Sequence, residues 1–394
     1  MLTPSIQGIV NGLADRLGLP VVLEDANQQL VAYSPHYDLM DRVREETILR
    51  RTTTQGVVDI FEAFDIVSQT LPTVIPANMA EGRLARLCIP IRYLDAVLGY
   101  AWVLLREEGV DADAFATAVQ AQEQLGLTML AESRVRARES DSLLSLISSD
   151  TDSRVQGLID VESRGGFEAP RRLVVVVCSG PAWHDAGVRG SFWTAAWAPE
   201  AQYQLRGVTA REGVALISIR TTPGEEVGGM LTRALRHVSH HREDAALVIG
   251  VGGVVDTPDE SHESYRQARL AARVALRDTG VAPVAWWDQL GVYRFLTQLP
   301  MQTLAASVDP RVASLVAGHP SFAETLECYL QESGAIGVVA KSLHIHRTTL
   351  YYRLDRVRSM GIQPNSGEDR TAVMTSLAAL RLLGRWPLDD HRNS

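Results

Sequence analysis

The sequence has few cysteines and no long apolar run. Cys88, Cys178 and Cys328 are odd in number, far apart and set among apolar residues, which favours buried thiols over disulfides or metal ligands. No segment approaches the roughly 20 consecutive apolar residues that a membrane span requires, and the N-terminus lacks a basic stretch followed by an apolar core. We therefore expect a cytoplasmic protein that does not contact a membrane.

The sequence also has no excess of positively charged residues. The chain carries a net charge of −9 at pH 7, and Lys341 is its only lysine. This acidic balance opposes non-specific attraction to nucleic acid, so any contact with DNA has to come from a local basic patch. The length of 394 residues exceeds what one hydrophobic core usually organises, and the composition is that of a globular protein with two or three domains.

Residues 1–110 are predicted to form an α/β domain. Apolar residues recur at helical spacing from Ile6 to Leu17, and Gly18 ends this helix. Residues 41–64 are expected to form a rather exposed helical segment. The predicted strands are 21–24, 29–33, 84–91 and 96–105.

Residues 111–150 are predicted to connect this domain to the next one. From 111 to 148 the chain has no proline and a single glycine, Gly126, which favours a helix of up to about 38 residues. Residues 132–141 are charged nearly all round the helix, as expected of a solvated connector.

Residues 151–300 are predicted to form a second α/β domain, because strand-like and helix-like segments alternate there. The nearly continuous apolar run at 173–178 is typical of a buried strand. Further strands are predicted at 213–219, 246–251 and 284–287. Helices are predicted at 225–239 and 261–276.

Residues 310–388 are predicted to form an all-α domain that contains a helix-turn-helix at 335–358. A short helix and a tight turn precede a second helix, in which Leu350, Leu354 and Val357 form one apolar stripe. The residues of the first helix that can face the core are Ile336, Val339, Ala340 and Leu343.

The face opposite the apolar stripe is basic, with a local net charge of about +4 over residues 341–358. In helix-turn-helix proteins the N-terminal turn of the second helix enters the major groove, so we expect residues 346–349 to read bases. Lys341, Arg353 and Arg358 are expected to bind phosphate. The predicted DNA-contacting residues are Lys341, His346, Arg347, Thr348, Thr349, Tyr351, Tyr352, Arg353 and Arg358. The alternative is an ordinary basic surface helix packed on its neighbour.

These residues also carry a resemblance to a known family. Residues 343–354, LHIHRTTLYYRL, resemble the signature helix-turn-helix of the PucR/CdaR transcriptional regulators, and residues 325–331 with Arg370 and Leu377 fit the same C-terminal domain. That domain is similar to the DNA-binding part of the factor for inversion stimulation. Residues 250–252 followed by 263–268 resemble the layout of a GGDEF-like domain, and the first domain resembles a GAF-type sensor fold.

The resemblance implies an effector-responsive transcriptional regulator. Its partners would be double-stranded DNA, an unknown small-molecule effector and further copies of the chain, in a homodimer or a larger homo-oligomer. A dimer would place two recognition helices on half-sites about 34 Å apart. The long helix and the middle domain would relay the state of the sensor domain to this pair of helices.

The rival hypothesis is a nucleotide-binding or cyclase-like signalling protein that acts through the middle domain. The chain contains no Gly-Gly-acid-acid-Phe string, and the corresponding hairpin near residues 211–213 holds one acidic residue, Glu212. We therefore predict a degenerate, non-catalytic domain, no enzyme activity, no catalytic residue and no cofactor. A third possibility is an interaction scaffold whose basic helix binds an acidic partner.

Two further groups of side chains were weighed as sites. His237, His240 and His241 lie at a helix end among charged residues, which favours a solvated terminus over a metal site. No metal site is predicted. An effector pocket in the first domain has as candidates Tyr33, His36, Arg50, Arg86, Arg92, Tyr100 and Trp102, and none of them stands out.

Overall fold

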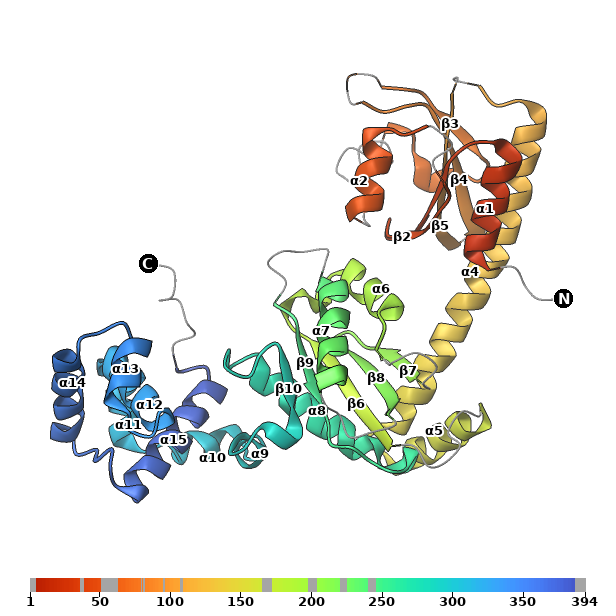
Figure 1. The fold of residues 1–394 in the computed structure, drawn as a ribbon. Coiled ribbons are helices and arrows are strands. Elements are labelled where there is room, and N and C mark those ends of the chain that lie inside the picture. Colours follow the sequence, from red (N-terminus) through yellow and green to blue (C-terminus); the bar gives the residue numbers. More distant parts are fainter. Residues whose placement is uncertain are drawn as a thin grey trace.

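The structure is a computed structural model that contains two sheet domains and a C-terminal helical domain (Figure 1). It describes residues 5–35, 39–50, 63–78, 80, 82–94, 96–106, 109–164, 172–197, 204–219, 225–239 and 246–386. His36, His240, His241 and residues 51–62 of the predicted exposed segment lie outside the described residues. None of the helices in the described part of the chain has the length and apolar character needed to cross a membrane.

The first sheet is antiparallel, with the strand order β2-β1-β5-β4-β3. Its strands are β1 (Val21–Asp25), β2 (Leu30–Tyr33), β3 (Thr73–Ile75), β4 (Arg86–Tyr93) and β5 (Ala96–Leu104). The four predicted strands are confirmed. Strand β3 was not predicted, because three residues are too few to show an alternating pattern.

One face of the first sheet is covered by α1 (Ile6–Leu17) and by the N-terminal half of α4 (Ala112–Leu146). The Ser5 side chain caps the start of α1, and Gly18 ends the helix in the left-handed conformation with φ 62°. The predicted first helix is therefore confirmed at both ends.

The other face of the first sheet is covered in part by α2 (Arg42–Arg50), and here the sequence prediction was wrong. Residues 41–64 were expected to be rather exposed, but Asp41, Arg44 and Thr47 are buried. The prediction was wrong because polar residues were assumed to face solvent. These three side chains are spaced three residues apart, so they lie on one side of the helix, and that side faces the domain.

Helix α4 joins the two sheets and contributes to both cores. The Asp111 side chain caps its first turn, and its 35 residues agree with the predicted long helix. Ala118 and Leu125 belong to the first core, whereas Leu143 and Leu146 belong to the core of the middle domain. Between them, residues 133–138 are exposed, as predicted for a solvated connector.

The middle domain contains the second sheet, with the order β10-β9-β6-β8-β7. Only the β9–β10 pair is parallel among the described pairings. The strands are β6 (Arg172–Ser179), β7 (Gln204–Val208), β8 (Glu212–Ile219), β9 (Val248–Val251) and β10 (Val284–Trp286). The predicted strands are confirmed at shifted ends, and β7 was missed because its five residues include a glycine.

Strand β6 is buried on both faces, as its apolar run predicts. Val175 and Val177 face α8 (Ser261–Ala275) and α5 (Thr151–Ser163), whereas Val174 and Val176 face α6 (Ala186–Thr194) and α7 (Glu225–Ser239). Helix α8 lies so close to β9 that a Cβ atom at Gly250 would clash with the Ala268 carbonyl oxygen. Glycine is therefore needed there for packing.

The remaining chain is helical. The helices are α9 (Tyr293–Leu296), α10 (Met301–Ala306), α11 (Pro310–Gly318), α12 (Pro320–Gln331), α13 (Ile336–Ser342), α14 (Arg347–Ser359) and α15 (Gly367–Leu382). Short 3-10 helices are η1 (Ile66–Ser68), η3 (Pro181–His184), η4 (Pro258–Glu260) and η5 (Trp287–Gln289).

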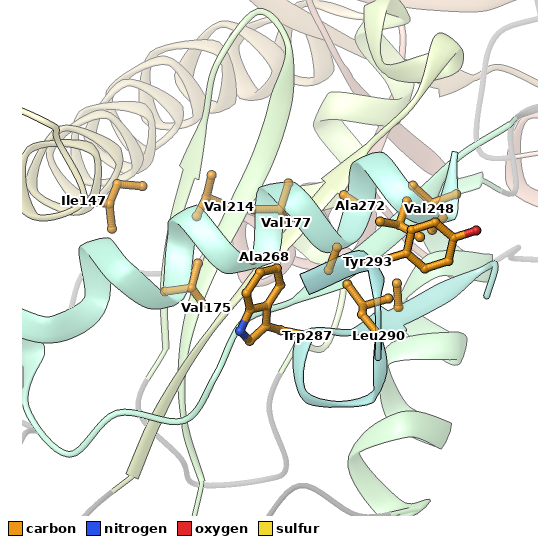
Figure 2. Close-up of a cluster of buried hydrophobic side chains, with 14 of the residues drawn as sticks. Ile147, Val175, Val177, Val214, Val248, Ala268, Ala272, Trp287, Leu290 and Tyr293 are labelled. Carbon is orange, nitrogen blue, oxygen red and sulfur yellow. The ribbon is translucent and has the colours of Figure 1, made fainter. Parts of the chain in front are cut away.

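Helix α15 belongs to two cores. Val373 and Leu377 pack inside the C-terminal domain, whereas Ala378 and Leu382 join the middle-domain cluster. Figure 2 shows Trp287, Leu290 and Tyr293 of that cluster beside Ala268 and Ala272 on α8. The C-terminal domain is thus docked on the middle domain through a shared helix.

Candidate nucleic-acid interface

The turn between α13 and α14 is set by local backbone geometry. His344 follows the end of α13 in the left-handed conformation with φ 52°, and the Ile345 N–H donates to the Ala340 carbonyl at 3.0 Å. This bond spans five residues, as in the Schellman motif that closes many helices. It reverses the chain within 343–346 and confirms the tight turn that the sequence predicts.

The first turn of α14 is capped by a histidine. Nδ1 of His346 accepts a hydrogen bond from the Thr348 backbone N–H at 3.3 Å and lies 2.7 Å from Thr348 Oγ1. An imidazole takes the role that Ser, Thr, Asp or Asn usually performs at this position. The two side chains are therefore held in a defined arrangement at the exposed end of the helix.

The rest of α14 separates a buried face from an exposed one. Leu350, Leu354 and Val357 are fully buried, which confirms the predicted apolar stripe. In Figure 1, α14 lies at the edge of the C-terminal domain that points away from the two sheets. The predicted DNA-contacting residues that are exposed are Lys341, His346, Arg347, Thr348, Thr349, Tyr351 and Tyr352.

Two of the predicted phosphate ligands are instead half-buried and make contacts within the domain. The Arg353 guanidinium donates to the Ser321 carbonyl at 3.3 Å and to Thr325 Oγ1 at 3.0 Å, both on α12. Arg358 forms an ion pair with Asp355 at 2.5 Å. The Arg353 contacts hold α14 against α12. The Arg358–Asp355 pair lies within α14 and reduces the positive charge available to a ligand at the C-terminal end of this helix.

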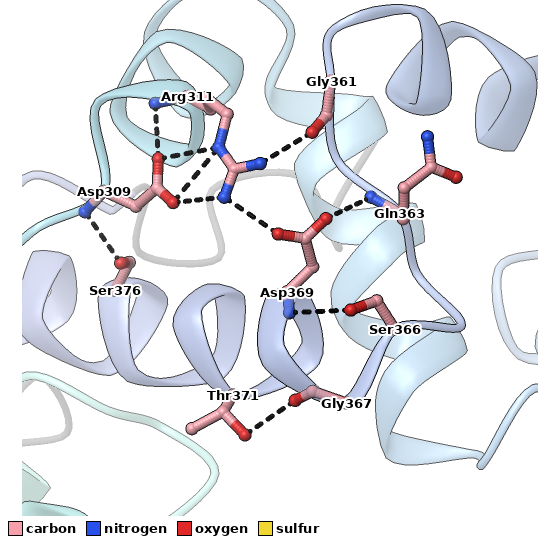
Figure 3. A network of polar contacts seen from close by, with 9 residues as sticks. All are labelled: Asp309, Arg311, Gly361, Gln363, Ser366, Gly367, Asp369, Thr371 and Ser376. Carbon is pink, nitrogen blue, oxygen red and sulfur yellow. Dashed lines mark hydrogen bonds and ion pairs between the residues drawn. The ribbon is translucent and has the colours of Figure 1, made fainter.

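A second arginine network holds the C-terminal end of α14 (Figure 3). Arg311 bonds Asp309 and Asp369 at 2.7 and 2.9 Å and donates to the Gly361 carbonyl at 2.7 Å. The Arg311 hydrogen bonds lower the pKa of Asp309; at Asp369 the Gln363 backbone N–H is the main cause of a lowered pKa, with Arg311 second. The network joins α11, α15 and the loop that follows α14.

A third arginine links the C-terminal domain to the middle domain. Arg381 on α15 binds both carboxylate oxygens of Glu327 on α12, each at 2.7 Å. Its Nε lies 3.8 Å from Asp278, which accepts a 2.7 Å hydrogen bond from the Tyr293 hydroxyl. Sequence reasoning missed Arg311 and Arg381, because the partners that they bring together are far away in the chain: Asp369 is 58 residues from Arg311, and Glu327 is 54 residues from Arg381.

The β7–β8 hairpin forms where the sequence places it. Glu212 is buried and accepts a hydrogen bond of 2.5 Å from the Tyr265 hydroxyl on α8, and Arg269 lies 3.4 Å from the same carboxylate oxygen. Burial and Glu212 together raise the pKa of Tyr265. Trp183 donates its indole N–H to the Thr209 carbonyl at 3.0 Å, so this aromatic side chain packs against the turn.

The structure describes the side chains of five candidate effector residues of the first domain, and these five do not all line one site. Arg86 and Trp102 line a cavity, whereas Tyr100 is buried in an apolar cluster and Arg92 donates to the Val67 carbonyl at 2.9 Å. Arg44 lines the same cavity and was missed, because α2 was expected to be exposed. The signal in the sequence is that polar residues recur every three positions, at 41, 44 and 47, and therefore share one side of a helix.

No group of three His, Cys, Asp or Glu side chains suited to a metal ion occurs among the residues that the structure describes. His237 is the described member of the histidine cluster, and its Nε2 lies 2.9 Å from Thr194 Oγ1.

A short helix, a tight turn and an exposed basic second helix define a class, the helix-turn-helix DNA-binding proteins. Residues 322–379 match the PucR C-terminal helix-turn-helix domain, and residues 149–274 match the GGDEF-like domain. The chain is therefore a DNA-binding transcription regulator with a PucR-type output domain and a GGDEF-like middle domain. The GAF-type resemblance of the first domain stays a prediction.

Similar proteins span nearly the whole chain. The DNA-binding transcriptional activator AdeR of Bacillus subtilis (strain 168) is 21% identical over 368 residues, 89% of this chain and 87% of AdeR. The proline-responsive transcriptional activator PutR of the same organism is 19% identical over 376 residues, 90% of this chain and 91% of PutR.

Among solved structures, a regulator of polyketide synthase expression from Bifidobacterium adolescentis is 16% identical and covers 63% of this chain and 94% of its own. Its TM-score is 0.30, at which the likeness supports no conclusion about the fold.

Proposed function

We propose that the protein is an effector-responsive regulator that places the N-terminal turn of α14 in the major groove of an operator. The observation that carries the proposal is the placement of Arg347, Thr348 and Thr349, which are exposed at one end of a helix whose opposite face is fully buried. Guanidinium and hydroxyl groups are the donors and acceptors that read base edges.

The roles of the individual residues follow from their exposure. Arg347, Thr348 and Thr349 read bases, while His346 caps the helix and orients Thr348. The phosphate contacts come from Lys341, Tyr351 and Tyr352, which are exposed around this turn. Arg353 adds positive charge to this helix but acts mainly by positioning it against α12. Arg358 adds positive charge that Asp355 partly offsets.

We further propose that the operator-bound form is a homodimer or a larger homo-oligomer, with half-sites about 34 Å apart. AdeR and PutR are both named as transcriptional activators, and PutR is named as proline-responsive. By analogy, a small molecule would bind the first domain and change operator binding through α4 and α15. A protein that binds the chromosome in this way would act in the cytoplasm.

The middle domain acts in this proposal as a scaffold without catalysis. Its hairpin carries a single acidic side chain, Glu212, and that carboxylate is occupied by Tyr265 and Arg269. Incubation of the full chain with GTP and Mg²⁺ should leave the nucleotide intact. Formation of a nucleotide product would overturn the scaffold role and favour a cyclase-like signalling protein.

Operator binding is tested with a DNA fragment recovered by selection from genomic DNA and fluorescence anisotropy with the full chain. Arg347→Ala should weaken binding by about 5- to 150-fold, the cost of about 1–3 kcal/mol for one base contact. The matched control is Arg211→Ala, an exposed arginine on the β7–β8 turn, which should bind as the parent protein does. Equal affinity of the two variants would refute the role of Arg347.

A further inference from the structure

A cavity in the first domain lies between α2 and the sheet face that α2 partly covers. Its volume is about 20 Å³, and it opens to solvent on one side. The strand register explains its walls: Val22 on β1 lies opposite Trp102 on β5, and Leu104 on β5 lies opposite Arg86 on β4. Residues opposite each other point to the same face, so these four side chains line one side.

Two buried guanidinium groups enter this cavity. Arg44 is 1% exposed and donates through Nη2 to the Ser34 carbonyl at 2.9 Å. Arg86 is 5% exposed and donates through Nη2 to Asp41 at 2.5 Å. Both charges are therefore removed almost completely from water.

These guanidinium groups retain unused donors. Nε and Nη1 of Arg44 and Nε of Arg86 have no hydrogen-bond partner among the residues that the structure describes. Burial, the largest cause, lowers the pKa of Arg44 to about 10; Asp41 opposes this shift and Arg86 adds to it. Buried charged donors are costly unless an acceptor meets them, so the cavity is built to receive one.

We propose that this cavity binds a small carboxylate ligand, with Arg44 as the principal ligand-binding residue and Arg86 as the second. The proposal rests on the proposed effector response, because it names the site and the ligand class for the first domain. Val22, Trp102 and Leu104 supply an apolar wall for the carbon skeleton of the ligand.

The charges around the cavity favour one carboxylate over a dianion. Glu24 lines the cavity and is 2% exposed, and Asp41 is 6% exposed beside Arg86. These two carboxylates balance the two guanidinium charges, so a second negative charge on the ligand would stay uncompensated, and the phosphate dianion is disfavoured relative to a single carboxylate. The Glu24 carboxylate is already engaged in the cavity wall, where it accepts a hydrogen bond from the Trp102 indole N–H at 2.9 Å.

The test is calorimetric titration of the full chain with acetate, butyrate, glycine and alanine. Acetamide and butyramide are the uncharged controls, and inorganic phosphate is the dianion. At least one carboxylate should bind more tightly than its amide and more tightly than phosphate. Equal binding of acids and amides, or a preference for phosphate, would overturn the ligand class.

Variants assign the binding to the cavity. Arg44→Met should weaken carboxylate binding by about tenfold or more, because charge-assisted hydrogen bonds are lost. The matched control is Arg83→Met, which removes a buried arginine of the same domain that donates to the Pro76 carbonyl and does not line the cavity. Thr47→Leu narrows the cavity and keeps both arginines, so it tests the site if Arg44→Met does not fold by circular dichroism. Parent-like affinity in folded Arg44→Met or in Thr47→Leu would overturn the proposal.

Operator affinity measured with and without the bound carboxylate separates this proposal from the proposed function. A carboxylate that binds through Arg44 without changing operator affinity would support the site and refute the effector response. An effector that alters operator affinity equally in the parent and Arg44→Met proteins would support the response and refute the site.

Discussion

The ion pair between Arg381 and Glu327 offers a direct way to perturb the docking of the C-terminal domain. Both guanidinium Nη atoms bind the carboxylate at 2.7 Å, and the two side chains are only 18% and 10% exposed. Arg381→Met would leave a buried carboxylate without its cation. We expect a loss of about 3 kcal/mol, the lower end of the cost of breaking a buried pair, because Arg381 keeps some contact with water.

Hydrogen exchange of the full chain, followed by mass spectrometry, measures this loss domain by domain. Because each 1.4 kcal/mol is a factor of ten, peptides of α12 and α15 should exchange about 10²-fold faster in Arg381→Met. Peptides of β4 and β5 in the first domain serve as the internal control, and their exchange should not change.

A double variant tests the physical reason for the loss. Arg381→Met combined with Glu327→Gln removes the unpaired charge at Glu327 and leaves only Asp278, which still accepts the Tyr293 hydrogen bond. The double variant should therefore be about 1–2 kcal/mol more stable than Arg381→Met alone. The reasoning is refuted if Arg381→Met changes exchange by less than about threefold, as at a surface pair, or if the double variant is the less stable one.

Three further changes test other parts of the structure. Tyr265→Phe removes the hydrogen bond to Glu212, so calorimetry should show a loss of about 1–3 kcal/mol in the middle domain; an unchanged transition would argue against the contact. The lowered pKa values of Asp309 and Asp369 stabilise the fold above the unfolded pKa, and this contribution is lost as the pH falls through the folded values. Unfolding followed from about pH 5 down to pH 2 should therefore show a steeper loss of stability in the parent than in Arg311→Met, and parallel profiles would contradict this assignment. Gly250→Ala should destabilise the protein by at least about 2 kcal/mol through its clash with α8, whereas Gly12→Ala, in open space on α1, should stabilise it by up to about 1 kcal/mol; equal thermal midpoints would show that the close approach at Gly250 is not required.

The helix-turn-helix could be predicted because its signals are local. The stripe of Leu350, Leu354 and Val357 lies within eight residues, and the basic residues surround it in sequence. The long helix α4 was predictable for the same reason, because the absence of helix-breaking proline and the near absence of glycine can be seen directly in the sequence.

The contacts that position these elements could not be predicted. The partners of Arg353 lie on α12, 28 and 32 residues away in the chain. Arg44 was missed because a polar helix is read as solvated unless the sheet beneath it is known. The sharing of α15 between two cores is likewise a tertiary feature, since both of its faces are apolar or small.

The central claim is that the N-terminal turn of α14 reads the operator in a symmetric complex. Hydroxyl-radical footprinting of the full chain on its selected operator tests it most directly. The account predicts two protected regions on one side of the duplex, about 34 Å apart, present with Arg211→Ala and lost with Arg347→Ala. One continuous protection that does not depend on sequence, or an unchanged footprint with Arg347→Ala, would contradict it.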